Sequence, residues 1–259
     1  MAGPSADIVI LGWSIHLYSL MLAAGLLFGF VVARRFALKK GIAEKDFDTT
    51  ILLILALGFL GARLFFVLGH WDEYFAKHVG EIIMFWRGGL AFYGGLIGGA
   101  AGLAAARLKY KYSFFNFLDA LALGLPIGQA VGRWGNYFNQ EAYGRPTDLP
   151  WGIYIDPSRR LAGFESYQYF HPTFAYESLG LILLFAVLFT VSRKNSYVPG
   201  VIFGTYAFFS GALRVVIEQL RVDALMLAGL KISQLVAIVL MIIGLLVLIS
   251  LRKDAGKIS

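Results

Sequence analysis

The sequence contains no cysteine and few charged residues. Charged residues make up 15% of the 259 positions, whereas a soluble domain usually carries about 25%. The absence of cysteine excludes disulfides, a cysteine nucleophile and thiolate metal ligands. Any thiol in the chemistry of this protein therefore has to come from a substrate. Hydrophobic residues make up 58% of the chain and the mean hydropathy is +0.69, which indicates an integral membrane protein.

Several enzyme motifs are also missing from the sequence. It has no Gly-x-Ser-x-Gly elbow, no Walker-type phosphate loop and no His or carboxylate cluster with metal-ligand spacing. We therefore expect neither a metal nor a cofactor. The net charge of +7 would suit a nucleic acid, but the basic residues are dispersed around apolar segments, so we expect no nucleic-acid partner. The N-terminus lacks the basic region of a secretory signal peptide, so we expect the first apolar segment to be retained.

Long apolar segments recur along the whole chain. About 20 apolar residues cross a bilayer as a helix. Seven segments fit this length, at residues 15–33, 50–69, 88–107, 116–133, 173–192, 199–219 and 231–251. The sequence therefore predicts an all-α integral membrane protein with about seven transmembrane helices, in a single polytopic domain over residues 1–259.

The basic residues predict the orientation of these segments. They gather after the first, third, fifth and seventh segments, at Arg34, Arg35, Lys39, Lys40, Lys45, Arg107, Lys109, Lys111, Arg193, Lys194, Arg252, Lys253 and Lys257. The positive-inside rule places such connections in the cytoplasm. The N-terminus is then outside and the C-terminus cytoplasmic. The long connection at about 134–172 becomes a small head region on the outer face.

A dense polar cluster follows the fourth apolar segment. Arg133, Asn136 and Asn139 are spaced to share one face of a helix, and Glu141 and Gly144 follow them. An Arg near the centre of a membrane helix costs roughly 2.5–3.5 kcal/mol, and less towards the interface. Arg binds phosphate through two parallel hydrogen bonds, and Asn adds neutral donors. A water-facing helix end would explain a lone Arg, but a cluster of this size favours an anion-binding site.

Two further sets of charged residues lie inside apolar segments. Arg214, Glu218 and Arg221 follow one helix face in the sixth segment. They form either an ion pair within the helix or part of a site for an anionic partner. Glu177 lies a few residues into the fifth segment and needs a nearby cation. Arg63 in the second segment could supply it.

Glycine and two titratable side chains complete the candidates. Gly94, Gly98 and Gly102 repeat a small-xxx-small spacing, which predicts close helix packing. Tyr93, next to them, needs a hydrogen-bond partner if it is buried. His171 precedes the fifth segment and either titrates near neutral pH in a site or lies in a solvated loop.

The polar cluster resembles a family signature. Gly132-Arg-x-Gly-Asn-x-x-Asn-x-Glu-x-x-Gly144 is similar to the signature of the bacterial prolipoprotein diacylglyceryl transferases. The resemblance covers nearly the whole chain in order, through His16-Leu-Tyr18-Ser-Leu-Met, Gly-Ala-Arg63, Gly94-Gly-Leu-Ile-Gly, His171-Pro, Tyr176-Glu177 and Arg214 with Glu218 and Arg221. It implies a seven-helix protein of the bacterial cytoplasmic (inner) membrane, with its N-terminus outside.

The resemblance also implies a reaction and a site. The diacylglyceryl group of phosphatidylglycerol, a membrane lipid, moves to the thiol of the lipobox Cys in a prolipoprotein signal peptide, which gives a thioether and glycerol phosphate. The family's lipid-binding and charge-stabilising residues match Arg133, Asn136, Asn139, Glu141, Gly144, Tyr18, Glu177, Arg214, Glu218 and Arg221. Arg133 and Arg214 would stabilise the charge that develops on the phosphate.

The sequence departs from the family at two positions. Some members have His, a proposed base for the thiol, where this chain has Tyr93, and many have Tyr where it has Ser210. A tyrosine with its ordinary pKa near 10 is a poor base at neutral pH. Tyr93, Glu141 and His171 are therefore all candidates for the base, beside activation of the thiol by arginines alone.

Other functions compete with this interpretation. A retinal-type receptor needs a Lys in the middle of its last helix, whereas Lys231 lies at its edge. A transporter for anionic solutes or lipids should have broken helices and internal repeats, and neither is evident. A divergent family member that binds anionic phospholipid without transferring it is the other alternative.

Overall fold

The computed structural model describes residues 3–10, 12–194, 197–223, 226–227 and 230–255, and helices dominate this part of the chain. The long helices are α1 (Leu17–Lys39), α2 (Glu44–Gly69), α3 (Phe92–Lys109), α4 (Phe114–Asn139), α5 (Thr173–Ser192), α6 (Val201–Leu220) and α7 (Ile232–Ala255). Short helical turns are η1 (Trp71–Phe75), η2 (Val79–Glu81), η3 (Phe85–Arg87) and η4 (Pro157–Arg159). The prediction of an all-α membrane protein is confirmed.

Three small two-stranded antiparallel sheets accompany the helices in the described residues. They pair β1 (Asp7–Ile10) with β2 (Trp13–His16), β3 (Ile153–Tyr154) with β4 (Tyr169–Phe170), and β5 (Met226–Leu227) with β6 (Leu230–Lys231). The first hairpin leads directly into α1, and the last leads into α7. Both hairpins therefore hold the start of a helix.

Six helices of the described residues are long and apolar enough to cross a membrane: α1, α2, α4, α5, α6 and α7. Helix α3, predicted as the third span, forms with 18 residues but is not one of these six. It is rich in glycine and ends in Arg107 and Lys109, and both features lower its hydropathy.

Helix α4 is longer than the apolar pattern predicted. It continues past the expected end at residue 133 to Asn139, because its last turn is polar but still helical. Two residues with left-handed backbone then turn the chain out of the helix, Gln140 with φ 51° and Ala142 with φ 56°. The head region therefore begins at residue 140 rather than 134.

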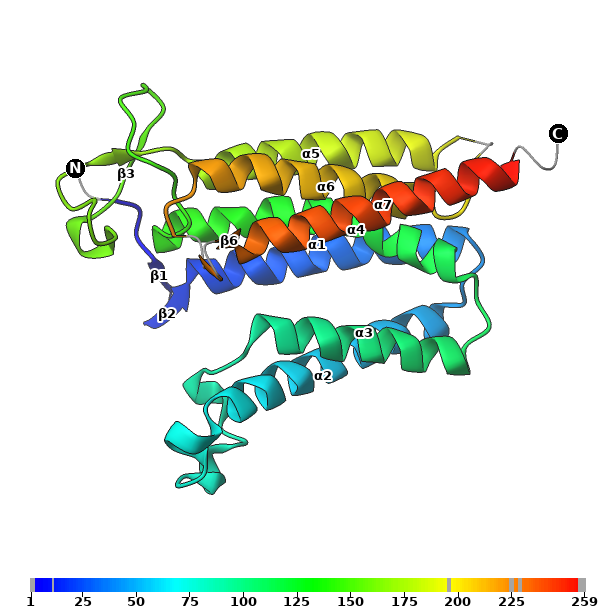
Figure 1. Cartoon of the computed structure of the whole chain (residues 1–259), viewed down its shortest axis with the longest axis horizontal. Helices are drawn as coiled ribbons and strands as arrows, with labels where there is room; N and C mark the ends of the chain where they lie inside the picture. The colour runs from blue at the N-terminus through cyan, green and yellow to red at the C-terminus, as the bar shows by residue number, and fades with distance from the viewer. Residues whose placement is uncertain (1–2, 11, 195–196, 224–225, 228–229, 256–259) are drawn as a thin grey trace. The chain divides into compact units, whose positions relative to one another are not determined.

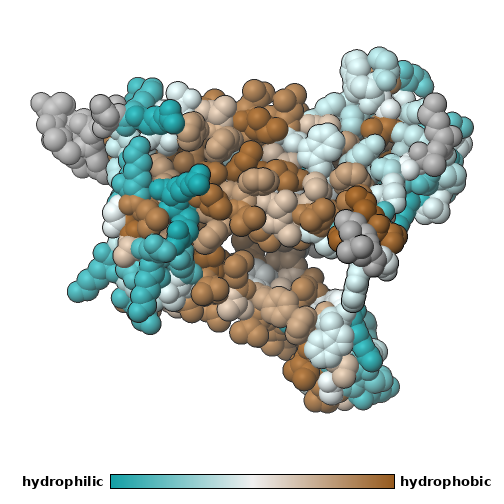
Figure 2. All heavy atoms as spheres, turned by 180° about the vertical axis from the view of Figure 1, so that it is seen from behind, coloured by the Kyte–Doolittle hydropathy of each residue, from teal (hydrophilic) through white to brown (hydrophobic). Residues whose placement is uncertain are grey.

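The chain forms two compact units. Unit 1 comprises Met1–Phe36 with Leu118–Ser259, and unit 2 comprises Ala37–Phe117. In unit 1, α6 lies between α5 and α7, and the three run side by side (Figure 1). Hydrophobic side chains cover the middle of the unit 1 bundle, and hydrophilic ones gather towards its two ends (Figure 2). This distribution is typical of a membrane-spanning bundle.

Glycines bring the helices of each unit into close contact. In unit 1, a Cβ added at Gly29 of α1 would lie 3.0 Å from the carbonyl oxygen of Gly124 of α4. In unit 2, a Cβ at Gly98 or Gly102 of α3 would meet the backbone of α2. The predicted packing role of the glycines in α3 is therefore confirmed.

Helix α6 is held at both ends by side chains of other elements. At its start, the fully buried carboxylate of Asp119 in α4 accepts hydrogen bonds from the backbone N–H of Gly200 at 2.5 Å and of Phe203 at 2.6 Å, and from the Tyr197 hydroxyl. At its end, Lys231 Nζ donates to the Glu218 carbonyl oxygen at 2.5 Å. An anion at the start and a cation at the end of a helix both complement its dipole.

The head has a small core of its own. Tyr143, Ile155 and Phe170 are buried against one another. The Tyr143 hydroxyl donates to the Arg159 carbonyl oxygen at 3.0 Å and accepts from the Leu161 N–H at 2.8 Å. These contacts order the segment after α4, so the long connection is a folded element.

Candidate active site

The polar residues of three helices meet at the end of unit 1 that carries the head. Glu177 of α5 is buried between two arginines. Its Oε1 accepts a hydrogen bond from Arg133 Nη2 of α4 at 2.8 Å, and its Oε2 accepts one from Arg214 Nη1 of α6 at 3.2 Å. Helices far apart in the sequence therefore contribute to one charged cluster.

Arg63 does not supply the cation for Glu177. Its guanidinium lies in unit 2 and donates to the backbone carbonyl oxygens of Glu81, Ile82, Gly88 and Gly89 at 2.7–3.0 Å. The expectation that Arg63 pairs with Glu177 is wrong, because the loop between α2 and α3 takes up this guanidinium. Arg63 instead orders that loop.

The charged set of α6 divides into two parts. Glu218 is almost fully buried, and its Oε2 lies 3.0 Å from Arg214 Nη2 without the geometry of a hydrogen bond to any described residue. Arg221 instead pairs with Asp223 through two contacts of 2.8 and 2.7 Å. The helix ends at Leu220, so Arg221 lies just beyond it, where it forms a β-bridge with Gly144.

Two amides bind Glu141, and one of them, Asn136, also contacts Arg133. Asn136 Nδ2 donates to Glu141 Oε1 at 2.8 Å, and Asn139 Nδ2 donates to Glu141 Oε2 at 3.3 Å. Arg133 Nη1 donates to Asn136 Oδ1 at 3.4 Å. The residues spaced along α4 thus lie in one chain of hydrogen bonds. Glu141 itself is exposed at the end of this chain of contacts.

Gly144 shapes the turn that follows. Its N–H donates to the His171 carbonyl oxygen at 2.9 Å, and the next N–H, of Arg145, donates to the Leu220 carbonyl oxygen at 2.8 Å. A Cβ at Gly144 would lie 2.7 Å from the His171 Cβ and 3.2 Å from the Leu220 oxygen. A larger residue would therefore push the head away from the end of α6.

Tyr18 lies beside the arginine-bearing turn of α4. A Cβ added at Gly135 would lie 3.0 Å from Tyr18 Cδ2 and 3.4 Å from the Tyr18 Cα. Gly135 therefore lets the start of α1 approach α4 within one turn of Arg133. The side chain of Tyr18 is half-buried there.

The two other candidate bases are His171 and Tyr93. His171 Nδ1 lies 3.2 Å from the Tyr176 hydroxyl, which also accepts a hydrogen bond from Trp151 Nε1 at 2.7 Å. This places the His171 ring in a network of aromatic side chains at the head. Tyr93 is at the start of α3 in unit 2, where its ring packs edge to face against Phe92.

Sequence reasoning missed one pair of side chains, Asp7 and His16, that contacts Asn139. His16 Nδ1 lies 2.7 Å from Asp7 Oδ1, and His16 Nε2 lies 3.1 Å from Asn139 Oδ1. His16 belongs to a segment that resembles a family motif, and this resemblance could have marked it as a site residue. Asp7 has no such signal, because only the β1–β2 hairpin brings it opposite His16.

The arginine cluster keeps capacity for an anion. Arg133 and Arg214 face the carboxylates of Glu177 and Glu218, so the formal charges of the four balance. A guanidinium carries five N–H donors, and the described residues contact no more than two groups on each of these arginines. The remaining donors suit a phosphate group.

Comparison with known proteins identifies the family. The family model for prolipoprotein diacylglyceryl transferase matches residues 7–250. The chain belongs to this family. The resemblance drawn from the signature and the assignment to a transferase family are confirmed.

Individual relatives agree with the family match. A protein of Fervidobacterium nodosum is 40% identical over 228 residues, which cover 88% of this chain and 78% of the relative. A protein of Finegoldia magna is 38% identical over 248 residues, 96% of each chain. One of Streptococcus pyogenes is 39% identical over 252 residues, 94% of this chain and 93% of the relative. All three are named phosphatidylglycerol–prolipoprotein diacylglyceryl transferase.

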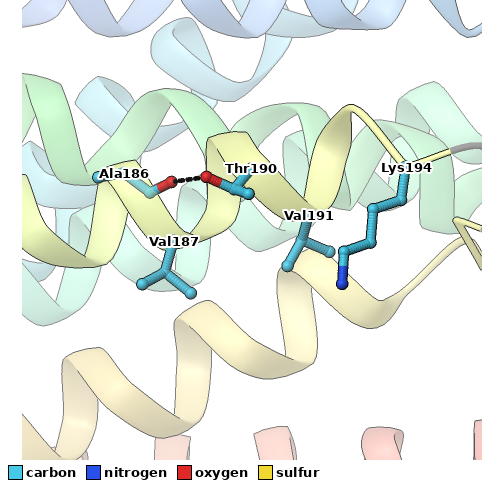
Figure 3. Close-up of a pocket in the computed structure, with 5 residues that line it drawn as sticks. All are labelled: Ala186, Val187, Thr190, Val191 and Lys194. Carbon is cyan, nitrogen blue, oxygen red and sulfur yellow. Dashed lines mark hydrogen bonds between the residues drawn. The ribbon is translucent and has the colours of Figure 1, made fainter.

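A surface groove lies near the end of α5 that is far from Glu177. Its volume is about 400 Å³, and it is lined by Ala186, Val187, Thr190, Val191 and Lys194 (Figure 3). The Thr190 hydroxyl is bonded to the Ala186 carbonyl oxygen. At 1.5 Å per residue, Thr190 is about 20 Å along α5 from Glu177. The groove is therefore separate from the charged cluster.

Proposed function

We propose that this protein transfers the diacylglyceryl group of phosphatidylglycerol to the thiol of the lipobox cysteine in a prolipoprotein signal peptide. The observation that carries the proposal is the pair of arginines held by one carboxylate, Arg133 and Arg214 on Glu177. The names of the relatives support the same substrates. The reaction supplies its own thiol, which suits a chain without cysteine.

The proposed step is a displacement at carbon. The thiolate sulfur attacks the lipid glycerol carbon that carries the phosphate ester, so that a C–S bond forms and the C–O bond breaks. The leaving glycerol phosphate takes both electrons of that bond, and its phosphate gains negative charge. Arg133 and Arg214 stabilise this charge most strongly in the transition state, where it develops. Glu177 fixes the spacing of the two guanidinium groups.

Other residues hold the lipid in our proposal. Asn136 and Asn139, with Glu141, face the hydroxyl groups of the lipid's glycerol head, because amides and a carboxylate supply both donors and acceptors. Tyr18 lines the space for the diacylglyceryl part. Gly144 keeps the turn close to α6.

A second set of side chains supports the arginines in this proposal. Glu218 faces Arg214 within α6. Arg221, paired with Asp223, steadies the end of that helix.

Activation of the thiol by arginines is the form of the mechanism that we favour. Both oxygens of Glu141 already accept amide hydrogen bonds, from Asn136 and Asn139. His171 is engaged by Tyr176 in the head. A thiol near two guanidinium groups loses its proton more readily, because the cations favour the thiolate. The proton then leaves to solvent or to the departing phosphate.

The placement of the chain in the membrane follows from its charges. We propose that it spans the bacterial cytoplasmic (inner) membrane as one polytopic domain, with the N-terminus and head outside and the C-terminus in the cytoplasm. The basic residues in the last turns of α1, α3 and α7 and in the segments that follow α1, α3, α5 and α7 support this orientation. The charged cluster then lies at the outer face, where a translocated signal peptide presents its cysteine.

Reconstitution tests the proposed function. The purified protein is incorporated into vesicles that contain phosphatidylglycerol and is incubated with a lipobox peptide. We expect the peptide to gain the mass of one diacylglyceryl group and glycerol phosphate to be released. Vesicles of phosphatidylethanolamine alone and a peptide with serine in place of cysteine are the controls. Binding of phosphatidylglycerol without any modification of the peptide would show a lipid-binding relative rather than a transferase.

A further inference from the structure

The N-terminal hairpin reaches the polar cluster through a histidine. Asp7 of β1 and His16 of β2 form a register pair of the hairpin, and their side chains meet at 2.7 Å. The other ring nitrogen of His16 lies 3.1 Å from Asn139 Oδ1. Both ring nitrogens thus face oxygen atoms. Two N–H groups satisfy this arrangement, which is the protonated form of the ring.

The contact between His16 and Asn139 decides the orientation of the Asn139 amide. An N–H on His16 Nε2 requires the Asn139 carbonyl oxygen to face it. The Asn139 NH₂ then points to Glu141 Oε2, 3.3 Å away. The reversed amide would place its oxygen against the Glu141 carboxylate, where two acceptors repel each other. The proton on His16 therefore keeps Asn139 as a donor to Glu141.

We propose that Asp7 and His16 are positioning residues for the headgroup site, because they fix the Asn139 amide and through it the Glu141 carboxylate. Neither side chain needs to touch the substrate. Glu141 is held from its other side by Asn136, which also contacts Arg133. The pair thus links the hairpin before α1 to the arginine-bearing turn of α4. This inference rests on the proposed transferase function.

The pair also gives the site a dependence on pH. The groups that face His16 are Asp7 from β1, Asn139 from α4 and Arg159 from η4. The hydrogen bond that His16 donates to the Asp7 carboxylate raises the pKa of His16 above its ordinary value, and Arg159 acts in the opposite direction. The ring keeps its second proton below this raised pKa and loses it as the pH rises through it. Positioning of Asn139 should therefore fail on the alkaline side.

Three variants of the full-length protein in phosphatidylglycerol vesicles test the inference, with the transfer rate measured against pH. His16→Ala should lower kcat about tenfold, since a hydrogen bond with a charged partner is lost. His16→Gln should stay within about threefold of the wild type, because its amide still donates to Asn139. In both variants, the decrease of the transfer rate at alkaline pH that we assign to His16 should be absent. Asp7→Asn should move that loss to lower pH, because the group that raises the pKa of His16 is gone.

His78→Gln is the matched control. His78 is exposed in unit 2, and its Nδ1 lies 3.0 Å from a backbone oxygen of the same segment, that of Tyr74. We expect its rate and pH profile to match the wild type. If the wild type is active and the His16 and Asp7 variants keep its rates and pH profile, the inference is wrong but the proposed function stands. A wild type that never modifies the peptide overturns the proposed function and the inference with it.

Discussion

Glu177 on α5 accepts a hydrogen bond from Arg133 on α4 at 2.8 Å, and its second oxygen lies 3.2 Å from Arg214 on α6. One carboxylate therefore sets the distance between two guanidinium groups that come from different helices. Buried charges of this kind are costly unless they are paired. These contacts hold three helices of unit 1 together, and in our proposal they also prepare the site for an anion.

Neutralising Glu177 tests this double role. Glu177→Gln keeps the shape of the side chain but removes the charge between two cations. We expect the free energy of unfolding to fall by about 3 kcal/mol, as for loss of one partner of a buried ion pair, and transfer to be strongly reduced. Thermal unfolding in detergent and the peptide assay measure the two effects. Glu73→Gln, at an exposed position of η1, is the control. Wild-type stability in Glu177→Gln would contradict the role in the bundle.

Arg133→Lys tests the contact with phosphate. Lys keeps the charge but cannot form two parallel hydrogen bonds to one phosphate. We expect kcat to fall about a hundredfold, as when one donor to a developing anion is removed. Initial rates at saturating phosphatidylglycerol measure it. Arg252→Lys, at an exposed position near the end of α7, should have no effect. An unchanged rate in Arg133→Lys rules out the proposed role.

Two glycines in one turn of α4 should respond differently to alanine. At Gly135 the new Cβ would lie 3.0 Å from the Tyr18 ring and close to its backbone, whereas at Gly132 nothing lies within 4 Å. We expect Gly135→Ala to destabilise the protein by about 1–3 kcal/mol through overpacking. Gly132→Ala should keep or raise stability by up to about 1 kcal/mol, since Ala favours a helix. Equal melting temperatures for the two variants would contradict the close approach of α1 to α4.

Tyr93→Phe separates the candidates for the base. If arginines alone activate the thiol, removal of the phenol hydroxyl should leave the transfer rate within about threefold, the size of one neutral hydrogen bond. Rates at several pH values measure the effect. A loss of two orders of magnitude would instead assign Tyr93 to the proton transfer.

Asp119→Ala tests the support of α6 at the end opposite the arginines. It removes the acceptor for the first N–H groups of the helix, so we expect the free energy of unfolding to fall by about 2 kcal/mol. Asp119→Asn should cost less, because an amide oxygen still accepts. Asp72→Ala, exposed in η1, is the control for the loss of a carboxylate. The expectation fails if Asp119→Ala melts at the wild-type temperature.

The sequence predicted the helices well but their ends and partners less well. In the described residues each of the seven predicted segments overlaps a long helix, and six of these helices are long and apolar enough to cross a membrane, because hydropathy is a local property that needs no knowledge of neighbours. The end of α4 was placed too early, since its last turn to Asn139 is polar and helical at once. Arg63 was suggested as the cation near Glu177 on the basis of charge alone. The fold gives each a different partner, because the loop of unit 2 surrounds Arg63.

By itself, the sequence determined the class of protein, the helices and the signature that places the chain in its family. Each of these depends on residue types and spacings along one segment. Only the tertiary structure decided that Glu177 joins Arg133 to Arg214, that Arg221 pairs with Asp223, and that Asp7 reaches Asn139 through His16. Such contacts depend on which helix faces and turns come together, and spacing within one helix carries no information about that.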